Sequence, residues 1–335
     1  MTDNIDLQRV FLDRLQKVIP KDQLLASVLT DTLSISVDAA YRRIKGKTNF
    51  SLEEALVLAR SYNLSLDGLT DPKQQNAHFS FQDLQANFES FEEYLDLLLA
   101  NLQRLEANED TQLYYSCLDI PIFFNLGHPQ IAAFKMFYWM HSVLEVEELQ
   151  TKVFEPDLIP ERFFKKGQEI YDTYCRIPSI ELWTTNTLNS TLRQIEFYNN
   201  AGHIRSREIN ELIFDDLQEM LNRISLMAER GSKIINRVPT EKERDNYKLY
   251  ESDIELTGNG ALALVGDHKI SFIGHLTFHT LTSDHPALNE KTLLWYQRLV
   301  RKANLISSVS AKNRYQFISQ LEADLNKTKA RILGS

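Results

Sequence analysis

A short stretch near the N-terminus gathers side chains that can bind phosphate groups and base edges. Its basic members are Arg42, Arg43, Lys45 and Lys47, and the window from residue 39 to 52 that holds them contains no carboxylate. Hydroxyl groups are supplied by Ser36, Tyr41 and Thr48, and Asp38 adds one carboxylate just before the window. Guanidinium and ammonium groups donate hydrogen bonds to phosphates and guanine, so these residue types favour contact with nucleic acid. The alternative is a solvated helix face, which is what most runs of charge form.

We expect a series of about five short helices to position these residues. They are predicted to span residues 5–18, 24–33 and 37–45, to continue from 52, and to end with a short helix after 65–67. Pro20 stops the first helix and Gly46 the third, because proline cannot continue a helix and glycine commonly ends one. Ser51 and Glu54 form a capping box that opens the fourth helix. The polar stretch 71–76 is typical of a linker.

The second and third of these helices have the spacing of a helix-turn-helix. Such a pair needs small and apolar residues at fixed positions so that a short turn locks the two helices together. The chain supplies them as Leu29, Thr30, Leu33, Ser34, Ile35, Ala40 and Ile44. Ser36 can cap the second helix of the pair with its hydroxyl group. The outward positions then belong to Asp38, Tyr41, Arg42 and Lys45, with Arg43 beside them.

These residues resemble the lambda-repressor/Cro-like helix-turn-helix family over about residues 20–70. The runs that carry the resemblance are Ala40-Tyr41-Arg42-Arg43-Ile44-Lys45-Gly46, Ser51-Leu52-Glu53-Glu54-Ala55 and Asn63-Leu64-Ser65-Leu66-Asp67-Gly68-Leu69. They look like the family's recognition helix, fourth helix and closing turn. Thr30 stands where the family usually has alanine, and Ser34 where it usually has glycine. The whole chain also resembles a group of bacterial regulators of about this length.

The resemblance implies that a recognition helix near 37–46 lies in the major groove of double-stranded DNA. The residues expected to bind DNA are Ser36, Asp38, Tyr41, Arg42, Arg43, Lys45, Lys47 and Thr48. Domains of this kind usually act as symmetric dimers, because one copy reads only half a site. The resemblance therefore predicts a sequence-specific transcriptional regulator that acts as a homodimer.

A regular apolar stripe after the linker offers one candidate for the dimer contact. Its members alternate spacings of three and four residues: Phe81, Leu84, Phe88, Phe91, Leu95, Leu98, Leu102 and Leu105. This a/d pattern fits a two-stranded coil, but its aromatic members fit a core helix of the larger domain equally well. The C-terminal helix, with Ile318, Leu321, Leu325 and Ile332, is a second, weaker candidate.

The remainder of the chain predicts a mainly helical domain with a small sheet. Helices are expected over 113–230, 286–304 and 312–332, and strands over 247–256, 261–265 and 269–281. Glycine-rich turns join the strands, so we interpret them as a three-stranded antiparallel meander near 247–282. The predicted organisation is a DNA-binding domain at 1–70, a linker at 71–80, and a dimerisation and sensor domain at 81–335.

The other clusters of functional residue types favour structural roles. His275 and His279 fall in one expected strand, where a four-residue step of roughly 13 Å prevents them from sharing a metal ion. We expect no metal, no cofactor and no catalytic residue. Aromatic residues crowd positions 114–139, which predicts core packing, with the wall of a small-molecule effector pocket as the alternative.

Charge and composition narrow the class of protein further. The net charge is −9, and residues 1–70 hold nine basic and nine acidic side chains, so the whole excess falls on residues 71–335. DNA binding would then depend on the local basic patch and would be selective and salt-sensitive. Two cysteines without a CxxC spacing, and the lack of a signal peptide or spanning segment, indicate a cytoplasmic protein.

Three hypotheses of different class follow from the sequence. The first is the dimeric DNA-binding regulator, which is not an enzyme. The second is a protein-interaction or scaffold protein whose helix-turn-helix domain does not bind DNA. The third is an enzyme within 110–335 that is tethered to a DNA-binding domain.

Overall fold

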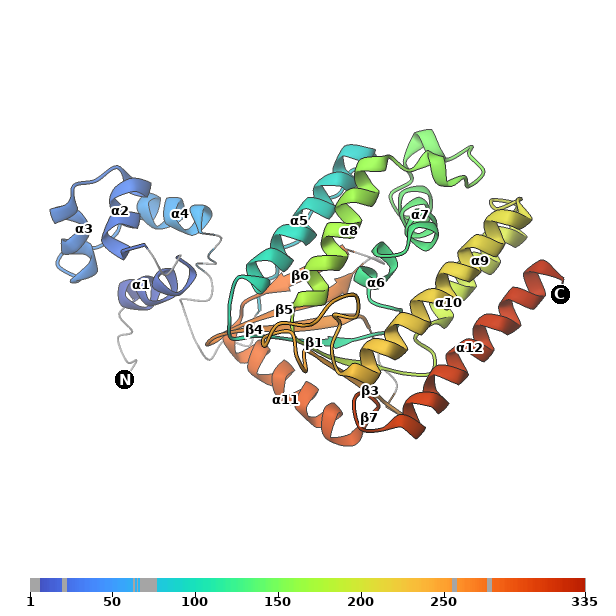
Figure 1. Ribbon diagram of the computed structural model, residues 1–335. Coiled ribbons are helices and arrows are strands. Elements are labelled where there is room, and N and C mark those ends of the chain that lie inside the picture. Colours follow the sequence, from blue (N-terminus) through green and yellow to red (C-terminus); the bar gives the residue numbers. More distant parts are fainter. Residues whose placement is uncertain are drawn as a thin grey trace. The chain divides into compact units, whose positions relative to one another are not determined.

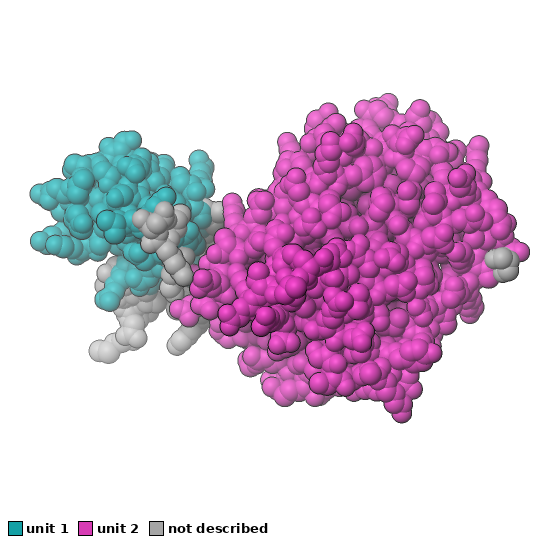
Figure 2. Space-filling view, viewed as in Figure 1, with its two compact units in different colours: residues 1–78 teal, residues 79–335 magenta. Residues whose placement is uncertain are grey.

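The computed structural model describes residues 7–19, 23–62, 64, 66, 77–254, 258–275 and 279–334. The chain divides into two compact units, residues 1–78 and residues 79–335, which Figure 2 shows in teal and magenta. The linker expected at 71–76 and the short helix expected after 65–67 lie outside the described residues.

The described part of unit 1 contains four α-helices, and their bounds agree with the sequence prediction. They are α1 (Leu7–Val18), α2 (Leu25–Leu33), α3 (Val37–Ile44) and α4 (Leu52–Ser61). The Ser36 hydroxyl accepts a hydrogen bond from the amide of Ala39 and caps α3. Ser51 and Glu54 form the predicted capping box at the start of α4. The prediction of these local elements is therefore confirmed.

Unit 1 has its own small hydrophobic core. Leu15 of α1, Leu29 of α2, Ala40 of α3 and Leu58 of α4 are all fully buried, so every helix contributes to it. Ala40 and Leu29 were expected to face inward from the helix-turn-helix spacing. This core fixes the rotation of α3 about its axis and thereby decides which of its side chains reach solvent.

The prediction of a small three-stranded sheet in unit 2 is wrong, because the unit contains a seven-stranded mixed sheet. Its strands are β1 (Thr111–Ser116), β2 (Ser179–Trp183), β3 (Tyr247–Glu251), β4 (Gly260–Val265), β5 (His268–His275), β6 (His279–Ser283) and β7 (Asn304–Leu305). The spatial order is β6-β5-β4-β1-β2-β3-β7. Strands β1, β2 and β3 are parallel, and β4, β5 and β6 form an antiparallel extension beside β1.

The three consecutive antiparallel strands are β4, β5 and β6, so the meander begins later in the chain than expected. The run 269–281 divides into β5 and β6, while the run that begins at Tyr247 forms β3 and pairs with β2 in parallel. Strands β1 and β2 lie in a region that the sequence predicts as helical throughout. Both are short and lie among helices, so their apolar residues carry no alternating pattern that separates them from buried helix.

Helices cover the two faces of the sheet unequally. Around the parallel strands lie α5 (Phe88–Glu106), α6 (Ile122–Leu126), α7 (Pro129–Tyr138), α8 (Glu161–Arg176), α9 (Asn189–Asn200) and α10 (Arg207–Arg230), with short turns of helix at Trp139–Val143, Glu147–Leu149 and Pro156–Leu158. On the other face lies α11 (Pro286–Lys302), and α12 (Ala311–Leu333) packs against α9 and α10. Both parallel crossovers thus cover the same face, and α11 packs against the opposite one.

The apolar stripe after the linker belongs to the core of unit 2. Helix α5 begins at Phe88, where Asn87 caps it, and not at Phe81, which is exposed. Phe91, Leu95 and four other apolar side chains of α5 are buried within the unit's own hydrophobic cluster. Of the two interpretations left open, the structure shows the core helix. The same holds for α12, whose Leu321 and Leu325 are buried.

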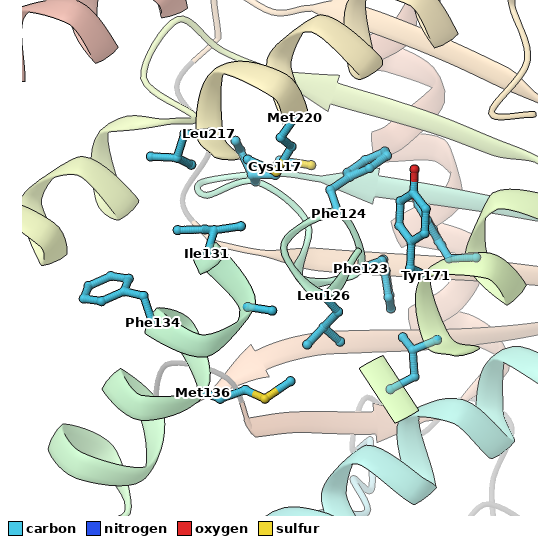
Figure 3. Packing of buried hydrophobic residues seen from close by; sticks show 14 of the residues in the cluster. Cys117, Phe123, Phe124, Leu126, Ile131, Phe134, Met136, Tyr171, Leu217 and Met220 are labelled. Carbon is cyan, nitrogen blue, oxygen red and sulfur yellow. The ribbon is translucent and has the colours of Figure 1, made fainter. Parts of the chain in front are cut away.

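The aromatic residues that crowd positions 114–139 also lie largely in this core. Phe123, Phe124 and Phe134 are buried, and Figure 3 shows them among Cys117, Ile131, Met136 and Met220. The ring of Phe123 stacks on Tyr174 with centroids 4.2 Å apart. Core packing, which the sequence favours for this cluster, is confirmed for these side chains.

A buried polar network crosses the centre of the core. The carboxylate of Glu181 accepts hydrogen bonds from the Tyr174 hydroxyl, from Ser179 at 3.1 Å and from the indole of Trp183 at 2.9 Å. Lys233 Nζ donates to Ser179 at 3.0 Å and lies 3.8 Å from the centroid of the Tyr174 ring. Burial lowers the pKa of Lys233 to about 8 and raises the pKa of Glu181. The two charged groups therefore depend on each other for compensation.

The edge of the sheet at β6 is partly closed by the start of unit 2. The amide of Ser80 donates to the carbonyl of Thr282 at 2.8 Å, and the amide of Thr282 donates back at 2.9 Å. Pairing of this kind protects backbone groups that an edge strand otherwise leaves open.

No helix within the described ranges is long and apolar enough to cross a membrane.

Candidate nucleic-acid interface

Helix α3 presents one continuous polar face to solvent. Asp38, Tyr41, Arg42 and Lys45 recur at intervals of three and four residues, and all four side chains are exposed. They lie opposite Ala40, which is fully buried against the other helices of unit 1. We call these four residues the α3 face. The structure thus brings together the outward positions that the helix-turn-helix spacing predicts.

An ion pair occupies the middle of the α3 face. Arg42 Nη2 lies 2.8 Å from Asp38 Oδ2, one helical turn earlier, and the two side chains remain 62% and 75% exposed. An exposed pair of this kind stabilises a helix by only about 0.3–0.5 kcal/mol. Arg42 can therefore leave Asp38 for a stronger acceptor at little cost, or approach a base with Asp38 still attached.

Arg43 has a different environment from its neighbours. Its guanidinium donates to both carboxylate oxygens of Glu54 in α4, at 3.1 and 2.6 Å, and to the carbonyl of Ala39 at 3.2 Å. Both side chains are mostly buried, at 14% and 21% exposed. The hydrogen bonds from Arg43 lower the pKa of the Glu54 carboxyl group. Of the predicted DNA-binding residues, Arg43 thus links α3 to α4 and does not lie on the α3 face.

The turn between α2 and α3 depends on an unusual backbone conformation at Ser34. This residue has φ 53° and ψ 42°, in the left-handed region, and its amide bonds to the carbonyl of Thr30. Glycine adopts this region without strain, so Ser34 stands at a position whose backbone favours glycine. At the next cap, the Ser36 hydroxyl accepts from Ala39 at 3.3 Å and keeps its own proton free to donate.

The segment after α3 is held in place by Gln8 of α1. Its side-chain amide donates to the carbonyls of Arg43 and Thr48 at 2.8 and 2.9 Å, and its oxygen accepts from the amide of Phe50 at 2.8 Å. Gly46 permits the sharp turn because its φ is +68°. Lys47 and Thr48 therefore lie on a fixed loop just beyond the α3 face, with exposed side chains.

Two residues important for this geometry were not predicted as part of the site. Glu54 carries a local signal as a capping-box residue, but its pairing with Arg43 is a contact between helices that no local pattern reveals. Gln8 bonds across 35 to 42 residues of sequence, so nothing in its neighbourhood indicates its role. Both act on the position of predicted residues and do not extend the exposed face.

His275 and His279, which the sequence analysis places too far apart to share a metal ion, are paired residues of adjacent strands. His275 ends β5 and His279 begins β6, and they pair directly across the hairpin. The expectation that both lie in one strand is therefore wrong, because the run 269–281 reverses direction between them. Within the ranges that the structure describes, no group of three or more His, Cys, Asp or Glu side chains could hold a metal ion.

Comparisons with known proteins identify no relative of this chain. No protein-family model, curated protein or solved structure matches the chain.

Proposed function

We propose that this protein is a sequence-specific DNA-binding transcriptional regulator of the lambda-repressor/Cro-like helix-turn-helix type. In this proposal α3 lies in the major groove, where Arg42 and Lys45 contact guanine acceptors or phosphates. Tyr41 and Ser36 donate hydroxyl hydrogen bonds, and Lys47 and Thr48 contact the backbone. Arg43 acts indirectly, by fixing α3 against α4 through Glu54.

The observation that carries this proposal is the α3 face. Its four side chains are exposed on the second helix of a pair that the Ser34 turn and the buried Ala40 hold at a fixed angle. A rigid helix with outward Arg, Lys and Tyr side chains is the geometry that direct readout of a major groove requires. The hydrogen bonds of Gln8 to Thr48 and Phe50 support the proposal further, because they fix the loop that carries Lys47.

The proposal includes two copies of the chain on one operator, in the cytoplasm. One α3 face offers few cations for phosphate contact, so a single copy binds only half a site weakly. The apolar stripes of α5 and α12 are used within unit 2, so the contact between copies uses other surfaces. Residues 79–335 then supply a second role, which we propose is the response to an effector.

Selection of duplexes from a random pool by the full-length protein tests the proposal. We expect an inverted-repeat motif, and binding that weakens with a log–log salt slope of about −0.9 for each phosphate contacted. Arg42→Ala and Lys45→Ala should each reduce affinity for the selected duplex. If no motif emerges and the double variant binds as the wild type does, the proposal fails.

The second candidate function is a protein-interaction or scaffold role for unit 1. It is favoured by the ion pairs of Arg42 with Asp38 and Arg43 with Glu54, which leave Lys45 and Lys47 as the cations of this region that form no ion pair within the described residues. This candidate predicts that duplex DNA of any sequence binds weakly and that the Arg42 variant is indistinguishable from wild type.

Light scattering on the same samples tests separately whether the DNA-binding regulator of the first proposal acts as two copies of the chain.

A further inference from the structure

Helix α11 of unit 2 has two faces of opposite character. Asn289, Tyr296 and Leu299 are buried against the sheet. The opposite side of the helix presents Lys291, Leu294, Trp295, Arg298, Arg301 and Lys302, and all six side chains are exposed. These positions recur at steps of three and four residues and therefore form one line along the helix, which we call the α11 stripe.

The α11 stripe is cationic on a unit that is otherwise acidic. Glu290 is the single carboxylate in α11, and it is paired with Lys269 of β5 at 2.6 Å. Within the described ranges, the four cations of the stripe form no ion pair. Residues 71–335 as a whole carry nine more acidic than basic side chains. The stripe is thus a local reversal of sign, which attracts a partner of negative charge.

Two large apolar side chains lie between these cations. Leu294 is 50% and Trp295 41% exposed, whereas Trp139 and Trp183 are 5% and 0% exposed. Trp and Arg are the residue types that most often dominate the binding energy of protein interfaces. A surface with Arg298 one turn from Trp295 combines both, so it suits a partner with carboxylates around one or two apolar side chains.

The arrangement favours a peptide over the other anionic partners. Duplex DNA gains nothing from two apolar groups in the middle of a basic line, because its backbone offers only phosphates and sugars there. A bilayer requires a broader apolar surface than two side chains supply. A symmetric contact between the stripes of two copies would bring together two lines of cations that include no carboxylate, which is repulsive.

We infer that the α11 stripe is a docking surface for an acidic peptide segment of another protein. The segment places an aliphatic or aromatic side chain against Leu294 and Trp295 and its carboxylates against Arg298 and Arg301. This inference concerns unit 2 alone and does not depend on DNA binding by unit 1.

A selection of random peptides of about twelve residues, displayed on phage, against the full-length protein tests the inference. We expect enrichment of Asp and Glu beside Leu, Phe or Trp. A synthetic copy of an enriched peptide should change the fluorescence of Trp295, the exposed tryptophan, with an affinity that falls as salt rises. The same peptide with Asn and Gln in place of its Asp and Glu residues should bind at least about tenfold more weakly.

Matched variants locate the site. Arg298→Glu with Arg301→Glu should weaken binding of the acidic peptide by at least about tenfold. Arg193→Glu with Lys327→Glu makes the same change of charge at exposed positions of α9 and α12 and should leave binding unchanged. Circular dichroism of both double variants should match the wild type, since none of the four side chains is buried.

Several results would overturn the inference. Selected peptides without acidic enrichment, or equal binding to both double variants, would show that the stripe is not the docking surface. Binding of a random-sequence duplex or of phosphatidylglycerol vesicles that only the Arg298 and Arg301 variant loses would assign the stripe to nucleic acid or membrane. Self-association lost in that variant alone would assign it to a second copy.

Discussion

Arg42 and Asp38 form an ion pair across one turn of α3, with Nη2 and Oδ2 separated by 2.8 Å on a solvent-exposed face. The remaining N–H donors of the Arg42 guanidinium stay available for a further acceptor. On DNA this pair would orient Arg42 toward the two acceptors of a guanine, while Asp38 repels phosphates that approach out of register. In the proposed complex the pair would combine attraction and repulsion in one place, as specific interfaces commonly do.

We expect Asp38→Ala to raise affinity for random duplex DNA and to lower discrimination in favour of the selected operator. Removal of the carboxylate takes away a charge that phosphates repel and frees Arg42 for any nearby acceptor. Fluorescence anisotropy with both duplexes at two salt concentrations measures the ratio. Asp31→Ala removes the same charge from an exposed position of α2 and should leave the ratio unchanged.

Arg42→Ala and Arg43→Ala should separate binding from stability. Loss of Arg43 leaves Glu54 partly buried without its partner, which should destabilise unit 1 by about 1–3 kcal/mol. Loss of the exposed Arg42 should cost less than about 0.5 kcal/mol and should act mainly on DNA affinity. Hydrogen exchange of the amides in α3 and α4 measures the first effect. Equal protection in the two variants would contradict the assignment of Arg43 as a link between helices.

The helices of unit 1 could be predicted because each is specified by residues within one or two turns of its ends. Ser36 and Ser51 cap helices, and Gly46 follows the end of α3. The exposed face of α3 follows from the same periodicity. The role of Arg43 could not be predicted, because its partner Glu54 approaches only when α3 and α4 pack together.

Ser34→Gly should stabilise unit 1 by about 1 kcal/mol. The backbone at Ser34 is held in the left-handed region, which costs an L-residue roughly 1–2 kcal/mol that glycine avoids. Slower hydrogen exchange in α2 and α3 of the full chain would show the gain. Ser36→Gly makes the same substitution at φ −70°, where no such strain exists, and should give no gain.

Glu243 should contribute stability to unit 2 that acid removes. Hydrogen bonds from Arg237, and then from Thr240, lower the pKa of Glu243 to about 2. Because the folded pKa is lower than the unfolded one, the contribution is present above about 4.5 and is lost as the pH falls toward about 2. Glu243→Gln should therefore lower the urea midpoint near neutral pH, and this difference should shrink through that window. Glu241→Gln, at an exposed position, serves as the control.

Removal of either charge of Glu181 and Lys233, which Ser179 bridges, should be costly. Lys233→Met leaves the buried Glu181 carboxylate without its nearby positive charge and should destabilise unit 2 by about 3–5 kcal/mol. Combination with Glu181→Gln should restore part of that loss, because the unpaired charge is then absent. Urea unfolding of the two single variants and the double variant completes the cycle. Additive losses would contradict coupling between the two groups.

The sheet of unit 2 escaped prediction for a physical reason that these residues illustrate. All five residues of β2 are buried, so no alternation marks it as a strand, and Glu181 in its centre interrupts the apolar run. The helix α5 and the late helices α11 and α12 could be anticipated from local periodicity. Which strands pair could not, because β3 joins β2 while its nearest neighbour in sequence, β4, joins β1.

The pairing of β1 with β4 has a consequence for the order of synthesis. The start of β1 at Thr111 pairs with the end of β4 at Val265, so one side of β1 stays open until β4 has left the ribosome. Unit 1, whose hydrophobic core is formed by its own residues, can fold well before that moment. The nascent chain thus carries a finished N-terminal unit and an incomplete sheet, and its exposure to aggregation or to chaperones is concentrated in that interval.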